Sequence, residues 1–289
     1  MVALAPAAVP VMGLTAMIWL VPQYGIDALA WGTVAGYGVE FLLLYTAIWL
    51  RGTPILPVWR GHEEAGYIIR QYACLFGGTL LMSSSLLVDQ SMATWVGEGS
   101  VTVLTYGYKL VAVLLGTVSL GLTTAVFPHF SQLVASGQRA DIERTLKRLV
   151  KLVLLLSIPL TALLILFSRP IVSLLFESSA MDADTVTTIA IVQACYLLHV
   201  PIFMAAILGS RLLTVLGGSQ ILLKNSVVNL LVSCVGNVIF MRTFGIAGIA
   251  LSTSCMYLVS AILIYRGLRI RLGKLAKTEV SANRPALAA

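Results

Sequence analysis

Charged residues are scarce in this sequence. Asp, Glu, Lys and Arg together make up 11% of its 289 residues, whereas an ordinary soluble domain has about 25%. Hydrophobic residues reach 58%, and the mean hydropathy is +0.94. This lack of charge excludes an ordinary water-soluble domain and indicates a chain that lies mostly in a lipid bilayer.

Residues for covalent chemistry are also few and dispersed. The sequence shows no Ser–His–Asp set, no paired catalytic carboxylates and no glycine-rich phosphate loop, so we predict neither an enzyme nor a cofactor or metal site. The net charge of +7 comes without a basic run interleaved with aromatics, so no nucleic-acid partner is expected. The four cysteines lie in apolar blocks without CxxC spacing, and we interpret them as core residues: Cys74, Cys195, Cys234 and Cys255.

The apolar residues form blocks of about 20, the length that crosses a hydrocarbon layer of about 30 Å. A stretch such as 152–167 is continuously apolar and does not alternate as a membrane β-strand would. The first block lacks the basic start of a signal peptide, so we expect it to be a retained helix. We therefore predict an all-α, polytopic transmembrane helix bundle with about eight spans: 1–21, 28–50, 68–94, 101–127, 146–168, 184–208, 220–240 and 246–268.

The basic residues are distributed unevenly between the two sides of these spans. Of the 19 Lys and Arg residues, sixteen fall in the loops and tail of one side, Arg169 and Arg242 on the other, and Lys109 inside a span. Short cytoplasmic loops collect Lys and Arg. We therefore predict a multi-pass membrane protein with both termini in the cytoplasm.

One segment outside the predicted spans is amphipathic. Residues 138–151 place Ile142, Leu146, Leu149 and Val150 on one helical stripe and their basic residues elsewhere. This pattern fits a cytoplasmic helix that lies on the lipid headgroups. The alternative is a solvated extension of the following span.

Residues 24–51 and 244–271 are identical at nine of 28 aligned positions, which indicates an internal repeat. Internal repeats are characteristic of transporters whose two lobes move about a central site. We expect residues 1–50 to be the last two transmembrane helices of an N-terminal lobe whose first four helices are absent. A cytoplasmic linker at 51–66, a six-helix C-terminal lobe at 67–272 and a disordered cytoplasmic tail at 273–289 complete the prediction.

Three segments carry a family resemblance. Residues 88–137, with an Asp, a Gly-Ser-Val turn, a Tyr-x-x-Lys-Leu sequence and a closing Phe-Pro, resemble the start of the C-terminal lobe of the MurJ/MviN lipid II flippases. Residues 148–176 and 210–232 resemble later helices of that lobe. This family belongs to the multidrug, oligosaccharidyl-lipid and polysaccharide exporter (MOP) superfamily. The sequence departs from the family in two ways. It lacks four helices, and it has Lys109 where Arg is common, so the charge is kept but the bidentate hydrogen bonding of a guanidinium is lost.

The resemblance implies a flippase of the bacterial inner (plasma) membrane that translocates undecaprenyl-diphosphate-linked peptidoglycan precursor by alternating access. Its partners would be the lipid-linked oligosaccharide, membrane lipids and a separate polypeptide that supplies the N-terminal lobe. Two alternatives remain open at this point. One is a polysaccharide or multidrug exporter of the same superfamily, and the other is a non-transporting remnant or regulatory membrane subunit, which the missing helices favour.

Ionisable residues inside spans are costly in lipid and are therefore candidate functional residues. Lys109 lies eight residues into its span, about 12 Å deep, and we predict that it faces a cavity and meets the substrate diphosphate. The alternative is a structural ion pair with Asp89 at comparable depth. Glu40, in the other lobe, is a candidate for a pair with Lys109 or for proton or cation coupling, or else a buried protonated carboxyl.

Three further cations lie at the cytoplasmic ends of spans, where they can attract an anionic substrate: Arg70, Arg211 and Lys224. Their alternative role is to determine topology. His199 and Pro201 are predicted to mark a helix kink in which the imidazole is hydrogen-bonded. Gly32 and Gly36 are predicted to allow close helix packing.

Overall fold

The computed structural model describes residues 5, 7–25, 27–50, 65–135, 139–176 and 182–283. Every regular element in these ranges is a helix, and they contain no strand, which confirms the predicted all-α class. The chain divides into two compact units, Met1–Glu63 and Glu64–Ala289, and each is described by itself. The predicted linker, residues 51–66, lies almost entirely outside the described residues.

Seven helices among the described residues are long and apolar enough to cross a membrane, compared with the eight spans predicted. They are Asp27–Trp49, Ile68–Ala93, Ser100–Ala135, Ala140–Leu166, Ala183–Val215, Ser219–Phe244 and Ile246–Gly273. The first predicted span, 1–21, contains instead a helix of 12 residues, Ala8–Trp19.

The N-terminal unit pairs two apolar helices. Helix α1 (Ala8–Trp19) is followed by the short α2 (Val21–Tyr24) and by α3 (Asp27–Trp49), which packs back along α1. Gly32 and Gly36 lie buried on α3 at this contact. A Cβ at Gly36 would lie 2.7 Å from the Val9 Cα, and one at Gly32 would collide with the Ala16 side chain. The predicted close packing at these glycines is confirmed.

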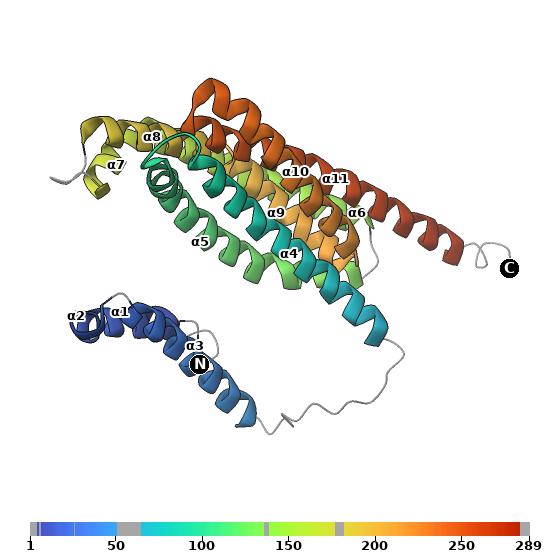
Figure 1. Cartoon of the computed structure of the whole chain (residues 1–289). Coiled ribbons are helices and arrows are strands. Elements are labelled where there is room, and N and C mark those ends of the chain that lie inside the picture. The colour runs from blue at the N-terminus through green and yellow to red at the C-terminus, as the bar shows by residue number, and fades with distance from the viewer. Residues whose placement is uncertain are drawn as a thin grey trace. The chain divides into compact units, whose positions relative to one another are not determined.

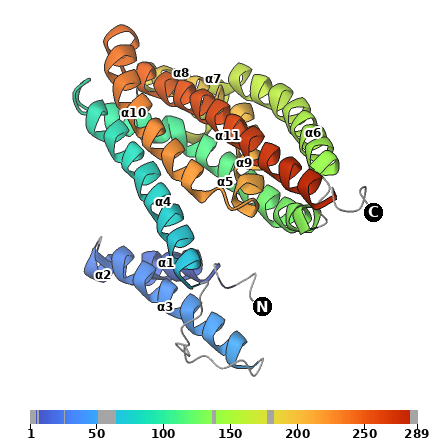
Figure 2. The same cartoon turned by 90° about the vertical axis from the view of Figure 1, so that its right-hand side faces the viewer.

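The C-terminal unit contains the remaining helices, and its core lies where α5, α8, α9 and α11 meet (Figure 1). Figure 2 shows α10 between α4 and α11, on both of which it packs. The bounds are α4 (Ala65–Ala93), α5 (Ser100–Ala135), α6 (Arg139–Leu166), α7 (Ser168–Phe176), α8 (Ala183–Leu197), α9 (Val200–Val215), α10 (Ser219–Phe244) and α11 (Ile246–Asn283).

Three details of this unit bear on the sequence predictions. The amphipathic segment 138–151 forms the first half of α6 rather than a separate helix, and its Ile142 and Leu146 pack in the protein core. The predicted kink at His199 is confirmed, because α8 ends at Leu197 and α9 begins at Val200. The predicted disorder after Gly273 is wrong up to Asn283, because α11 continues to that residue.

Candidate functional site

A line of buried polar side chains runs along α10, which is otherwise largely apolar. Asn225, Asn229, Ser233 and Asn237 are spaced four residues apart, so they share one face of the helix, and all are buried. Asn225 and Asn229 each donate from Nδ2 to the Ser260 Oγ on α11, over 2.8 and 3.1 Å. In lipid, such interhelical hydrogen bonds hold helices together. This α10 polar ladder therefore joins α10 to its neighbours.

Asp89 on α4 lies at the end of this ladder. Its Oδ1 accepts hydrogen bonds from the Asn237 Nδ2 at 2.6 Å and the Ser233 Oγ at 2.9 Å. Its Oδ2 accepts from the Thr253 Oγ1 on α11 at 3.3 Å. The residue is only 6% exposed, and burying a carboxylate is costly unless donors compensate it. Three donors from two helices supply that compensation.

The Asp89 carboxylate borders a cavity of about 420 Å³, which we call the Asp89 cavity. Three tyrosines contribute to its wall, Tyr108 from α5, Tyr196 from α8 and Tyr257 from α11. A second cavity of about 350 Å³, the Arg211 cavity, shares Met82 and Tyr257 with the first. The two cavities are therefore neighbours along one polar face of an apolar bundle.

Arg211 and Arg70 are both held by neighbouring side chains. Arg211 lines the Arg211 cavity together with residues of the α10 polar ladder, and its Nε donates to the Thr123 Oγ1 on α5 over 3.1 Å. Arg70, near the start of α4, donates from Nη2 and Nε to the carboxamide oxygen of Gln220 on α10, over 2.6 and 3.0 Å. Lys224, one turn further along α10, is exposed.

Lys109 does not form the alternative ion pair with Asp89. Its ammonium lies 5.3 Å from the centre of the Tyr106 ring, a distance typical of a cation–π contact. The side chain is exposed on α5 and lines neither cavity, although Thr105, one turn earlier on the same helix face, lines the Asp89 cavity. Lys109 thus sits one helical turn from that cavity.

Glu40 is half-buried on α3 in the N-terminal unit. It forms no hydrogen bond or ion pair with the described residues of its own unit. Its predicted partner, Lys109, belongs to the C-terminal unit. The pair between the two units stays a prediction.

His199 differs from the sequence prediction in its hydrogen bonding. The imidazole is fully buried and stacks on Tyr257, with ring centres 4.6 Å apart and planes 11° from parallel. Neither ring nitrogen has a hydrogen-bond partner among the described residues. The predicted hydrogen-bonded imidazole is therefore wrong, and aromatic stacking takes its place.

The arrangement described so far is that of an all-α membrane protein, in which two cavities with polar side chains in their walls border helices that otherwise suit lipid. Solved structures with the same fold include a lipid II flippase MurJ in an inward closed conformation, with a TM-score of 0.71 and 18% identity, over 96% of this chain and 59% of that one. An outward-facing multidrug resistance MATE family transporter of the MOP superfamily matches with a TM-score of 0.69 and 18% identity, over 89% of this chain and 58% of that one. The chain therefore shares its fold with these two proteins.

The family model for lipid II flippase MurJ matches residues 1–286. The chain belongs to this family, and it is a multi-pass inner-membrane protein. The lipid II flippase MurJ of Burkholderia cenocepacia is 24% identical over 286 residues, covering 93% of this chain and 54% of the relative. The probable lipid II flippase MurJ of Vibrio cholerae is 25% identical, over 86% of this chain and 47% of the relative. The chain thus spans about half the length of these relatives.

Proposed function

We propose that this chain is part of a flippase that carries lipid II, an undecaprenyl-diphosphate-linked peptidoglycan precursor, across the inner membrane by alternating access. The observation that supports this most is the match of the family model over nearly the whole chain. The adjoining Asp89 and Arg211 cavities add a physical reason, because a polar head group needs a polar surface within the membrane.

The cations of the C-terminal unit are the proposed contacts for the diphosphate. The Arg211 guanidinium borders a cavity, and its Nε bond to Thr123 fixes the direction of the side chain. Lys109 is held only by a ring contact, so its ammonium can turn toward an anion. Both termini are proposed to be cytoplasmic, which puts Arg70, Arg211 and Lys224 on the side where the substrate is made available.

We propose the domain organisation that the sequence predicts. Residues 1–50 form two helices of an N-terminal lobe, and residues 67–272 form a C-terminal lobe. Alternating access requires two lobes that move about one site. The chain covers 54% of the Burkholderia cenocepacia relative. We therefore propose that transport requires further polypeptide, supplied as a separate N-terminal lobe.

A reconstitution experiment tests this proposal. Proteoliposomes would contain the chain alone, or the chain with a polypeptide that supplies the first four helices of a family lobe, and flipping of fluorescent lipid II would be followed. We expect flipping only in the second sample and competition by unlabelled lipid II. Transport of cationic drugs in place of lipid II would support a multidrug exporter instead. Copurification of both polypeptides without any flipping would contradict the proposal.

A further inference from the structure

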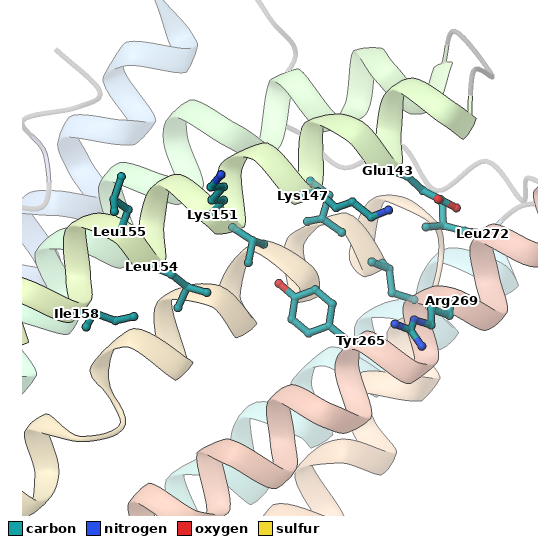
Figure 3. Close-up of a pocket in the computed structure, with 12 residues that line it drawn as sticks. Glu143, Lys147, Lys151, Leu154, Leu155, Ile158, Tyr265, Arg269 and Leu272 are labelled. Carbon is teal, nitrogen blue, oxygen red and sulfur yellow. The ribbon is translucent and has the colours of Figure 1, made fainter.

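A groove of about 850 Å³ lies between α6 and α11, apart from the two polar cavities (Figure 3). Its floor consists of leucines that belong to the core, Leu146 of α6 and Leu268 and Leu272 of α11, which are 6%, 2% and 3% exposed. The floor is therefore fixed by the packing of the unit. The packed core of the unit thus forms the bottom of the groove.

One end of the groove is apolar. Leu154, Leu155 and Ile158 of α6 line it, and Leu155 and Ile158 are 69% and 55% exposed. Tyr265 of α11 lies between the two helices in Figure 3. Its hydroxyl donates to the Ala205 carbonyl oxygen over 2.8 Å, so it has a partner inside the protein. The ring thus adds an apolar wall, and this end of the groove suits a hydrocarbon chain.

The other end carries an excess of positive charge. Lys147 of α6 and Arg269 of α11 line it, and Lys151 lies one turn further along α6, between Lys147 and Leu155 in Figure 3. All three cations are exposed. Figure 3 shows Lys147 and Arg269 toward the end that Glu143 and Leu272 mark, with Leu154 and Ile158 at the opposite end. Three cations and the one carboxylate of Glu143 leave a formal charge of +2. None of the three cations forms an ion pair with a residue that the structure describes.

The groove has the length of one lipid. Residues 143 and 158 bound it on α6, and fifteen residues of helix extend about 22 Å. Half of a bilayer, headgroups included, is about 20 to 22 Å thick. The basic residues come at the start of the α6 span, Ala140–Leu166, and the leucines follow deeper along it. The basic residues and the apolar surface therefore follow one another along the groove in the same order as the headgroup and the acyl chains of a phospholipid.

From this order we propose that the groove between α6 and α11 binds one acidic glycerophospholipid. The anionic headgroup lies against Lys147, Lys151 and Arg269, and an acyl chain follows Leu154, Ile158 and the Tyr265 ring. Basic pockets between transmembrane helices select anionic headgroups in this way. Two other occupants fit the groove less well. A zwitterionic headgroup would leave the formal charge of +2 uncompensated. A further apolar helix would bury the three cations without partners, which is costly.

Lipid retention by the purified full chain tests the proposal. The chain in detergent would receive equal amounts of phosphatidylglycerol and phosphatidylcholine with identical acyl chains, and bound lipid would be counted by native mass spectrometry. We expect retention of phosphatidylglycerol over phosphatidylcholine by about tenfold, because each cation near a headgroup contributes to the preference. K147Q/K151Q should reduce this preference to about twofold or less. Leu154→Trp, which fills the apolar end, should lower retention of both lipids.

R144Q/R148Q is the matched control. It removes two positive charges from the same part of α6, but neither Arg144 nor Arg148 lines the groove, and Arg144 pairs with Asp141 at 3.5 Å. We expect this variant to retain the preference of the unchanged chain. An equal loss in both double variants would show a general charge effect and overturn the proposal.

Two further results would also overturn it. One is equal retention of the two phospholipids by the unchanged chain, and the other is displacement of phosphatidylglycerol by undecaprenyl phosphate at equal concentration, which would assign the groove to an isoprenoid lipid. The assay measures binding without transport. Its outcome is therefore independent of the proposed flippase activity.

Discussion

The Asn237 amide on α10 donates to the Asp89 carboxylate on α4 over 2.6 Å, and this bond joins two helices inside the membrane-spanning bundle. Ser233 and Thr253 donate to the same carboxylate. Asp89 thus accepts from both α10 and α11. A single acidic side chain therefore connects three helices, and it forms no ion pair with the residues that the structure describes.

Replacing Asp89 separates the effect of its hydrogen bonds from that of its charge. Asp89→Ala leaves two buried donors, the Asn237 Nδ2 and the Ser233 Oγ, without an acceptor, whereas Thr253 keeps its bond to the Ile249 carbonyl oxygen. We expect this change to lower the free energy of unfolding by about 2 kcal/mol or more. Asp89→Asn keeps an acceptor oxygen and should cost less than half as much. The unfolding midpoint of each variant in detergent measures the difference. Equal midpoints for the two variants would mean that the hydrogen bonds add no stability.

Gly36 gives a prediction for the N-terminal unit. Gly36→Val puts a side chain against the Val9 backbone at 2.7 Å, so α1 and α3 must separate. Gly38→Val is the matched control, since a Cβ there meets nothing within 4 Å. Trp19 and Trp31 lie in this unit, so melting followed by tryptophan fluorescence should show a midpoint lowered by several degrees for Gly36→Val alone. Similar midpoints for both variants would contradict the packing at Gly36.

The spans and several helix ends could be predicted from the sequence because lipid imposes a strong constraint on composition. A continuous apolar block longer than about 18 residues has few other uses. For the predicted span 1–21, the part that the structure describes contains the 12-residue helix α1. For 138–151 the prediction left two interpretations open, a helix on the lipid headgroups and an extension of the following span, and α6 contains the extension. The sequence could not decide between them, because charge on one face of a helix does not reveal that its other face packs in the core.

The surroundings of Asp89 were predicted only in part. Depth along a span can be counted from the sequence, and it placed Asp89 beside Lys109. The direction in which a side chain points from the helix axis does not follow from its depth. The Asp89 carboxylate faces α10 and α11, not Lys109. The α10 polar ladder was missed although it has a sequence signal. Asn225, Asn229, Ser233 and Asn237 recur every four residues in an apolar span, which predicts a shared buried face.

Substitutions of His199 test how its two buried ring nitrogens affect the stability of the protein. Its two ring nitrogens lack partners among the described residues, whereas its ring stacks on Tyr257. His199→Phe keeps an aromatic ring and removes two unpaired polar atoms, so we expect the unfolding midpoint to stay the same or rise. His199→Ala should lower the free energy of unfolding by about 2 kcal/mol or more through a cavity. A marked decrease for His199→Phe would indicate that the nitrogens have a partner in the membrane.

The predicted orientation can be measured by cysteine labelling. Glu98 lies between α4 and α5, at the opposite end of α5 from the loop that leads to the basic start of α6. In a variant whose four native cysteines are replaced by serine, Glu98→Cys should react with a membrane-impermeant maleimide in intact spheroplasts. Arg148→Cys should react only after permeabilisation. The reverse pattern would place the C-terminus outside the cytoplasm.

Lys109 is the residue on which the proposed recognition of the diphosphate depends most directly. Its ammonium is held by the Tyr106 ring alone, one helical turn from the Asp89 cavity. Lys109→Glu reverses the charge and should reduce lipid II flipping at least tenfold in the complete two-lobe system, whereas Lys109→Arg retains the charge and should keep most of the activity. Arg242→Glu, in the exposed last turn of α10, is the matched control for a charge reversal at an exposed helix end. If Lys109→Glu flips lipid II at the unchanged rate, a cation at this depth is not required for transport, and Arg211 becomes the first alternative to test.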